Sequence, residues 1–212
     1  VILNGRNQER LKKTLQELSG EGYEIISADL SMEKDRTRLI DNLPKLDGLV
    51  QCAGVGSRVP CKMIGKDDLE HVFVPNVEAP ILLQTELLAK KKINKSSSIV
   101  FIASKAASFP SIGNAAYSAS KGAIISYAKC LALELAPRQI RVNCICPAMV
   151  WTDLIIQGGM SKEDLEEAQL KYPLKRYGKP EDIAYLAIYL LSDASSWMTG
   201  TCVDITGGAK EL

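Results

Sequence analysis

Short runs of apolar residues alternate along the chain with longer stretches in which apolar residues recur every three or four positions. The short runs are typical of buried strands, and the longer pattern is typical of amphipathic helices. After Asn7, for example, Leu11, Leu15 and Leu18 share one helical face. The pattern predicts strands at residues 1–3, 24–28, 48–52, 98–103, 141–145 and 201–205, and helices after Asn7 and at residues 67–76, 80–92, 117–136, 161–171 and 180–192.

The strand runs are apolar throughout rather than alternating, as in Ile99, Val100, Phe101 and Ile102. A strand needs apolar residues on both sides when helices cover both faces of its sheet. The alternation of strands and helices therefore predicts a doubly wound α/β fold with a parallel sheet. No linker, repeat or low-complexity segment interrupts the sequence, so we expect one domain over residues 1–212.

Composition then limits the kinds of partner. A chain of 212 residues, 46% of them hydrophobic, can bury roughly 70% of its unfolded surface in one core. The net charge of +1 argues against nucleic acid, which requires a basic surface. The apolar stretch at residues 122–136 contains Lys129 and Glu134 and is shorter than the about 20 apolar residues of a membrane span. We expect neither partner.

The six cysteines lie mostly inside apolar runs. In a mid-sized chain this favours buried thiols in a reduced, cytoplasmic protein over a disulfide framework. His71 is the only histidine, and the close pair Cys144 and Cys146 lacks the spacing of zinc ligands. We therefore expect no metal site.

One run of lysines has two interpretations. Lys90, Lys91, Lys92 and Lys95 follow a predicted helix, where cations complement the helix dipole. Alternatively, the run would dock an acidic carrier protein. The first interpretation is favoured because charge runs at helix ends are common.

Candidate chemistry follows the predicted strand at residues 98–103. Ser104 comes directly after it, and Tyr117 and Lys121 open the longest predicted helix, one turn apart on one face. A phenol with a pKa of about 10 is a poor acid-base group at neutral pH. A neighbouring ammonium group lowers that pKa, so Tyr117 could exchange a proton with a carbonyl or alcohol oxygen. An isolated pair with this spacing usually lies on a solvated face.

This pair is accompanied by Asn76 near a helix end, by Ala53 and Gly54 after the strand at 48–52, and by residues 147–152 after the strand at 141–145. With these residues the sequence resembles the short-chain dehydrogenase/reductase family, from its first residue to about residue 208. Residues 173–184 and 199–208 resemble the 3-oxoacyl-carrier-protein reductase branch. The resemblance implies a Rossmann-like fold and an NAD(P)-dependent enzyme that reduces a carbonyl, in a 3-oxoacyl thioester or a similar ketone, to an alcohol.

The resemblance also assigns roles to four residues. Tyr117 would be the acid-base residue, and Lys121 would lower its pKa and bind the nicotinamide ribose. Ser104 would hold the substrate carbonyl oxygen. Asn76 would position a water molecule that relays protons to Lys121.

The end of the first strand bears on the choice of cofactor. Arg6 stands where an acidic residue of this family would bind the 2′-hydroxyl of NAD. A guanidinium group there suits a 2′-phosphate, so NADP is favoured and NAD remains possible. The alternative is a surface arginine near a helix start. The other cofactor-binding positions implied by the resemblance are Asp29 and Leu30 beside the adenine, and Ala53, Gly54, Tyr117, Pro147, Ala148, Val150 and Thr152.

The sequence departs from the family pattern in three places. Gln51 and Cys52 replace two asparagines, and Ala148 replaces a glycine. The family's opening strand, glycine-rich loop and first helix are absent, so we expect a longer working protein with about 30 further residues. Their strand would lie between those at residues 1–3 and 48–52. Because the glycine-rich loop that would hold the pyrophosphate is absent, the alternative is a non-catalytic Rossmann-like binding or scaffold protein.

Small residues surround Tyr117 and allow another helix to approach closely; they are Ala115, Ala116, Ala119, Gly122 and Ala123. In the family that helix helps to form a homotetramer, whereas the alternative is tight packing within one subunit. Residues 151–172 would form a substrate lid without a recognisable pocket motif.

Overall fold

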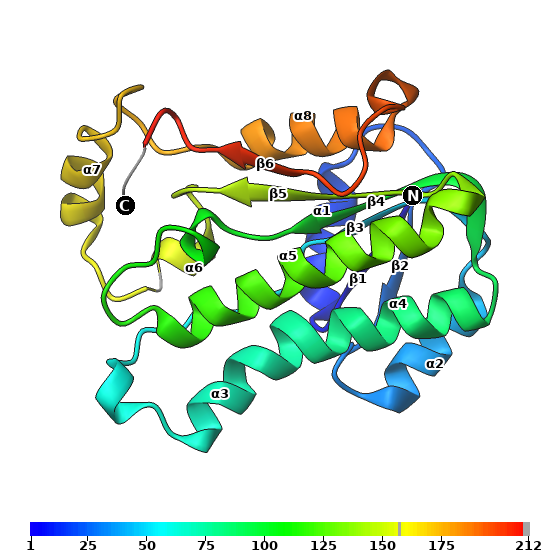
Figure 1. The fold of residues 1–212 in the computed structure, drawn as a ribbon, viewed down its shortest axis with the longest axis horizontal. Coiled ribbons are helices and arrows are strands. Elements are labelled where there is room, and N and C mark those ends of the chain that lie inside the picture. The colour runs from blue at the N-terminus through cyan, green and yellow to red at the C-terminus, as the bar shows by residue number, and fades with distance from the viewer. Residues whose placement is uncertain (157, 210–212) are drawn as a thin grey trace.

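The computed structural model describes residues 1–156 and 158–209 and forms a parallel α/β fold of the Rossmann type (Figure 1). All strand pairs are parallel, and the strands lie in the orders β1-β2 and β3-β4-β5-β6. The strands are β1 (Ile2–Gly5), β2 (Glu24–Ser27), β3 (Leu46–Gln51), β4 (Ile93–Ile102), β5 (Arg141–Pro147) and β6 (Cys202–Ile205).

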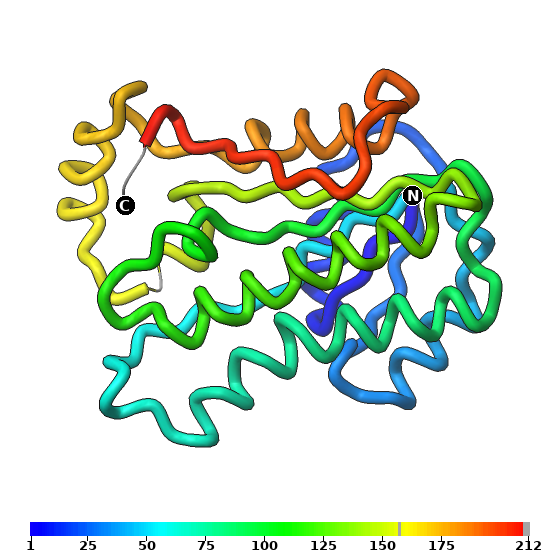
Figure 2. Tube along the Cα trace, in the orientation of Figure 1, coloured from blue at the N-terminus to red at the C-terminus, as the bar shows by residue number. Residues whose placement is uncertain are grey.

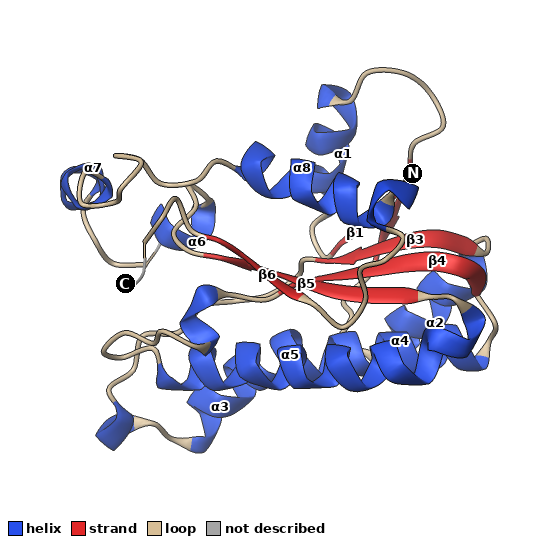
Figure 3. Cartoon of the chain, turned by 45° about the horizontal axis from the view of Figure 1, so that its top comes forward, coloured by secondary structure: helices blue, strands red, loops and turns tan. Residues whose placement is uncertain are grey.

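Helices cover both faces of the sheet, which confirms the doubly wound fold (Figure 3). The first face carries α1 (Gln8–Glu17) and α8 (Pro180–Leu191). The second carries α2 (Glu33–Asn42), α3 (Lys66–Phe73), α4 (Ala79–Ala89) and α5 (Ala115–Leu135). The short helices α6 (Asp153–Ile156) and α7 (Lys162–Gln169) lie beyond the end of β5.

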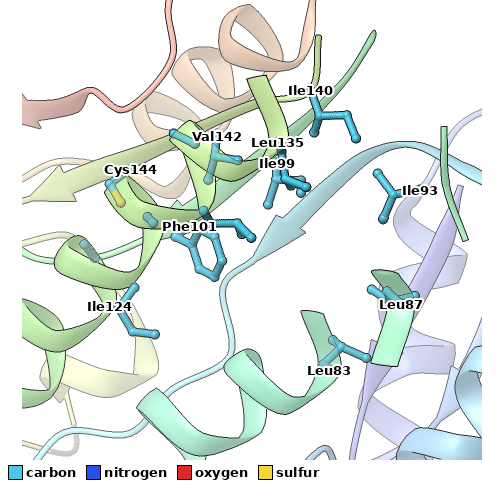
Figure 4. Packing of buried hydrophobic residues seen from close by; sticks show 14 of the residues in the cluster. Leu83, Leu87, Ile93, Ile99, Phe101, Ile124, Leu135, Ile140, Val142 and Cys144 are labelled. Atoms are coloured by element: carbon cyan, nitrogen blue, oxygen red, sulfur yellow. The ribbon is translucent and has the colours of Figure 1, made fainter. Parts of the chain in front are cut away.

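The larger core lies between β4, β5 and the helices α4 and α5 (Figure 4). Ile99 and Phe101 of β4 and Val142 of β5 point into it and are almost fully buried. Val100, between Ile99 and Phe101 on β4, and Ile145 of β5 point to the other face. They are equally buried, in a second core on the α8 side. Each such side chain contributes about 1.5–3 kcal/mol when buried, which explains why these strands are apolar on both sides.

The predicted strands are present, but the helices differ in two places. The sequence pattern missed α2, because Leu39 and Ile40 are its only buried apolar residues and it begins without a side-chain cap. The helices predicted at 67–76 and 80–92 form one continuous helical run, with the π-turn η2 (Val74–Glu78) joining α3 and α4. Pro75 lies inside that π-turn, where its missing N–H is tolerated.

The sheet is divided into two pieces in the described part of the chain. β1 pairs with β2, and β3 pairs with β4, but β1 and β3 do not pair with each other. The division falls between the two strands where the sequence predicts an additional strand. That additional strand remains a prediction.

The lysines after α4 are engaged locally. The ammonium group of Lys90 lies 2.6 Å from the Asp41 carboxylate, and that of Lys92 donates to the backbone carbonyls of Asp41 and Leu43. These contacts hold the end of α4 against the end of α2. They are consistent with a local structural role for the lysine run at the helix end. In the described ranges, no helix is long and apolar enough to cross a membrane.

Candidate active site

The segments that follow β3, β4 and β5 come together at one edge of the sheet, because parallel strands all end on the same side. Figure 2 shows the green loop after β4 and the yellow segment after β5 both at the left end of the molecule. The first segment contains Ser104 and leads to Tyr117 and Lys121 at the start of α5. The second begins at Pro147, the last residue of β5.

Lys121 is buried and held at the end of β4. Its ammonium group donates to the carbonyl oxygen of Ile102 at 2.9 Å and lies 5.8 Å from the ring centre of Tyr117. Burial disfavours the charged form and lowers the pKa of Lys121 to about 8. The predicted Tyr117–Lys121 pair is therefore a pair in space, on the buried side of α5.

Tyr117 lies beside Ser104, and both its burial and this neighbour affect its pKa. Burial raises the pKa of Tyr117, while a side-chain hydrogen bond with Ser104 lowers it. The expected effect of Lys121 on this pKa remains a prediction; its ammonium group lies 5.8 Å from the Tyr117 ring centre.

Asn76 lies in the π-turn, buried between α5 and the segment after β3. Its Oδ1 accepts from the Val55 N–H at 2.8 Å, and its Nδ2 donates to the Val55 carbonyl at 2.9 Å and to the Ser120 Oγ at 3.1 Å. These three hydrogen bonds hold the loop after β3 against the π-turn and α5. Its predicted role in a water relay to Lys121 remains a prediction.

Gly54 lies against these residues and leaves no room for a side chain. A Cβ atom at this position would be 3.0 Å from Asn76 Oδ1 and 3.4 Å from Lys121 Nζ. The contact brings the end of β3 to the end of β4 and the start of α5. Ser104, Tyr117, Lys121, Asn76 and Gly54 consequently form one cluster.

Arg6 and Asp29 form a separate group at the ends of β1 and β2. The Arg6 guanidinium lies 3.8 Å from the Asp29 carboxylate, and its side chain is 69% exposed. Asp29 also accepts from the backbone N–H and hydroxyl of Ser31. These hydrogen bonds, and secondarily Arg6, hold the pKa of Asp29 below its usual value. Arg6 keeps exposed N–H donors that suit a phosphate group.

The remaining cofactor-binding candidates lie on two loops of the four-stranded piece. Ala53 precedes Gly54 and is exposed. The Ala148 N–H donates to the Ile205 carbonyl at 3.0 Å, and Val150 forms an isolated parallel bridge with Gly178. The Thr152 hydroxyl donates to the Val150 carbonyl. Leu30, in the other piece, has its carbonyl bound by buried Arg36 at 2.9 Å.

An aromatic cluster, which the sequence pattern did not indicate, anchors the predicted lid. The ring centres of Trp151 and Tyr177 are 5.5 Å apart, and those of Tyr172 and Tyr177 are 5.0 Å apart. The cluster also contains buried Leu165 of α7. The lid therefore packs on the loop after β5, while residue 157, within the predicted lid, lies outside the described residues.

Sequence reasoning also missed Lys105, whose largely buried side chain forms an ion pair with the half-exposed carboxylate of Asp204. A charged residue directly between Ser104 and the small residues Ala106 and Ala107 was the available signal. Over residues 1–156 and 158–209, no group of three or more metal-ligating side chains is present. All six cysteines are free.

A family profile described as enoyl-(acyl carrier protein) reductase matches residues 1–210. The 3-oxoacyl-acyl-carrier-protein reductase FabG of Rickettsia felis is 33% identical over 208 residues, which cover 98% of this chain and 85% of the relative. The human dehydrogenase/reductase SDR family member 4 is 33% identical over 215 residues, covering 98% and 77%.

Solved structures give the same result. A short chain dehydrogenase family protein from Francisella tularensis superposes with a TM-score of 0.84 at 35% identity, covering 98% of this chain and 86% of that one. A short-chain dehydrogenase/reductase from Brucella melitensis also has a TM-score of 0.84, at 30% identity, with 98% and 84% covered.

Proposed function

The chain belongs to the short-chain dehydrogenase/reductase family of NAD(P)-dependent oxidoreductases, and on that premise we propose that it reduces a ketone to an alcohol with NADPH. The observation that carries the proposal is the cluster of Ser104, Tyr117 and Lys121 at the carboxyl edge of the sheet. Its hydroxyl and ammonium groups suit a reaction in which negative charge develops on a carbonyl oxygen.

Tyr117 gives its phenolic proton to the carbonyl oxygen as that oxygen becomes an alkoxide. Burial keeps Tyr117 protonated before the reaction, because it raises the pKa of the phenol. Ser104 donates to the same oxygen and afterwards to the phenolate. Lys121, positively charged below pH about 8, stabilises the phenolate. When bound, NADPH supplies the hydride to the carbonyl carbon.

The residues at the cofactor side fit a nicotinamide dinucleotide. Gly54 lets the loop after β3 lie directly against Asn76 and the Lys121 ammonium group, and we assign this loop and Lys121 to the nicotinamide ribose. We assign Asp29 and Leu30 to the adenine side and Ala53, Pro147, Ala148, Val150 and Thr152 to the nicotinamide side. Arg6 supports NADP over NAD, because its exposed guanidinium can donate to a 2′-phosphate.

We assign a 3-oxoacyl thioester, or a related small ketone, as the substrate. The support is the 33% identity to a 3-oxoacyl-acyl-carrier-protein reductase, together with the resemblance of residues 173–184 and 199–208 to that branch. The lid after β5 contributes the apolar side chains Leu154 and Ile156, which are both exposed and suit an acyl chain.

The test mixes the protein with NADPH and a panel of β-keto thioesters and simple ketones and follows the loss of NADPH absorbance. We expect turnover of at least one β-keto thioester, with NADPH preferred over NADH. The proposal fails if no substrate oxidises the cofactor.

The second candidate function is a non-catalytic binding or scaffold protein. The division of the sheet between β1 and β3 favours it, because cofactor-binding candidates lie on both pieces. Titration calorimetry with NADPH separates the two functions. Tight binding excludes the scaffold, and absence of binding excludes the reductase.

We also propose that the protein is a cytoplasmic homotetramer. The free thiols of all six cysteines favour a reducing compartment. On α5, Ala119 is exposed and a Cβ at Gly122 would meet nothing within 4 Å, so this small-residue face is open to a helix of another subunit. Light scattering on Gly122→Leu should show a smaller assembly than the wild type.

A further inference from the structure

Lys105 is buried next to the proposed catalytic serine. Its side chain is 11% exposed, and its Nζ lies 2.5 Å from the Oδ2 of Asp204 on β6. The same Nζ lies 4.2 Å from the ring centre of Phe109, within the range of a cation–π contact. The lysine is thus held at its charged end by two groups.

The backbone of Lys105 organises the turn that follows Ser104. Its carbonyl accepts from the N–H groups of Ser108 and Phe109 at 3.0 and 2.9 Å. Ser104 caps the same turn, since its Oγ accepts from the Ala106 N–H at 3.2 Å. The rotamer of Ser104 therefore depends on where this turn sits.

The partner Asp204 belongs to the strand that holds the nicotinamide-side loop. Asp204 is in register with Cys146 of β5, and the next pair is Pro147 with Ile205. The Ile205 carbonyl then accepts from the Ala148 N–H. The ion pair consequently ties the Ser104 turn to the strand end that carries Pro147 and Ala148.

Stability alone does not account for this pair. A largely buried ammonium group costs free energy to desolvate, and an apolar side chain of similar size usually serves stability as well or better. The Asp204 side chain is 49% exposed and can be solvated without its partner. What an apolar residue would lack is a directional contact across the sheet.

We propose that Lys105 is a positioning residue that, through Asp204, fixes the Ser104 hydroxyl relative to Tyr117 and to the loop at Pro147 and Ala148. The inference rests on the proposed reductase function, because it takes Ser104 as the group that holds the carbonyl oxygen. Misplacing such a group lowers the rate of the chemical step more than it weakens binding.

The experiment compares Lys105→Met, Lys105→Arg and Asp204→Asn with the wild type. In Lys105→Met we expect kcat to fall about tenfold, with the KM of the ketone within about threefold. Lys105→Arg keeps the charge and should recover most of kcat. The double variant Lys105→Met/Asp204→Asn should have the same kcat as Lys105→Met alone, because both substitutions remove the same ion pair.

Ser98→Ala is the matched control in the middle of β4, six residues before Ser104. It removes a buried hydrogen bond to the Leu190 carbonyl, 2.7 Å long, and should lower stability while leaving kcat unchanged. The proposal is overturned if Lys105→Met keeps wild-type kcat, if Lys105→Arg is as impaired as Lys105→Met, or if Ser98→Ala lowers kcat equally.

Amide hydrogen exchange separates this inference from the proposed function, since it needs no turnover. In Lys105→Met the amides of Ala106, Ser108 and Phe109 should exchange faster, while those of residues 99–101 should not change. If the wild type reduces no ketone, the proposed function fails and exchange alone decides whether Lys105 fixes the turn. Unchanged exchange in the turn overturns the inference.

Discussion

The two pieces of the sheet hold their candidate functional residues in different ways. In the four-stranded piece Lys121 and Asn76 are buried, and each is fixed by hydrogen bonds to the backbone. In the two-stranded piece Arg6 is 69% exposed, and its acidic neighbour Asp29 is 3.8 Å away. The candidate residues of the four-stranded piece are therefore pre-organised, whereas Arg6 in the two-stranded piece is open to solvent.

The difference matches the chemistry proposed for each piece. Proton transfer needs groups held within hydrogen-bonding distance before the reaction, in a site where burial strengthens electrostatic interactions. Recognition of a phosphate group is compatible with an exposed arginine, because its guanidinium presents a charged, planar fork of N–H donors to the phosphate oxygens. Four changes test this comparison, in order of expected size.

Tyr117→Phe should lower kcat by about 10³, because it removes the proposed acid from the buried cluster. The Kd of NADPH should stay within about threefold, since the cofactor-side arginine is untouched. The measurements are steady-state kinetics and titration calorimetry.

Tyr127→Phe is the matched control on the same helix. Tyr127 packs edge-on against Phe101 in the core, with 6.0 Å between ring centres, and its loss of a hydroxyl should leave kcat unchanged. Full activity in Tyr117→Phe would contradict the assigned role.

Lys121→Met should lower kcat less than Tyr117→Phe does, and it should raise the free energy of unfolding at neutral pH by up to about 3 kcal/mol. Burial lowers the pKa of Lys121 from 10.5 to about 8, so the folded state disfavours the charged form. Between these two values the unfolded chain binds more protons, and wild-type stability should rise with pH. Urea unfolding at several pH values measures both effects.

In Lys121→Met that rise with pH should disappear from the same window, since the titrating group is gone. A variant that is less stable than the wild type, with the rise retained, would show that Lys121 is not the group responsible.

Glu86→Ala should lower the free energy of unfolding by about 2 kcal/mol, because it leaves the buried Arg36 charge without its partner. The two groups are 2.8 Å apart, and the Glu86 side chain is 25% exposed. The contact joins α2 to α4 and so helps to hold the two-stranded piece against the rest. Chemical unfolding measures the loss.

Arg10→Ala is the control for this contact. Its pair with Asp153 also links α1 to the segment after β5, at 3.6 Å, but both side chains are well exposed, and such pairs contribute little. Equal losses in the two variants would mean that burial does not decide how the pieces are joined.

Arg6→Ala should weaken NADPH binding about tenfold, the loss of one exposed charge-assisted contact. The affinity for NADH should not change, because NADH lacks the 2′-phosphate. Calorimetry with the two cofactors gives the ratio of the NADPH and NADH dissociation constants for the wild type and for the variant. An equal loss for NADH would assign Arg6 a structural role and remove the argument for NADP.

Much of this arrangement was predictable from local patterns. The apolar runs indicated the six strands because burial on both faces leaves a direct mark on the sequence. The spacing of Tyr117 and Lys121 indicated one helical face, and Ser104 was indicated by its place after a strand. The helix α2 was missed because it buries few apolar residues, and the π-turn was missed because proline normally ends a helix.

The site contacts between distant segments were not predictable. Lys105 and Asp204 are 99 residues apart in the chain, and Asn76 and Val55 are 21 apart. The Lys121 ammonium group donates to the Ile102 carbonyl, 19 residues earlier in the chain. The hydrogen-bond or ion-pair partner of each side chain depends on which group lies nearest to it after folding.

The sequence by itself determined the class of fold, the order of its elements and the residue types at the edge of the sheet. These follow from periodicity and from the rule that parallel strands end on one side. Only the tertiary structure decided which hydroxyl faces Tyr117, which carbonyl holds Lys121 and that Lys105 reaches Asp204. The physical reason is that hydrogen bonds and ion pairs act over a few ångströms, a distance that folding sets and chain spacing does not.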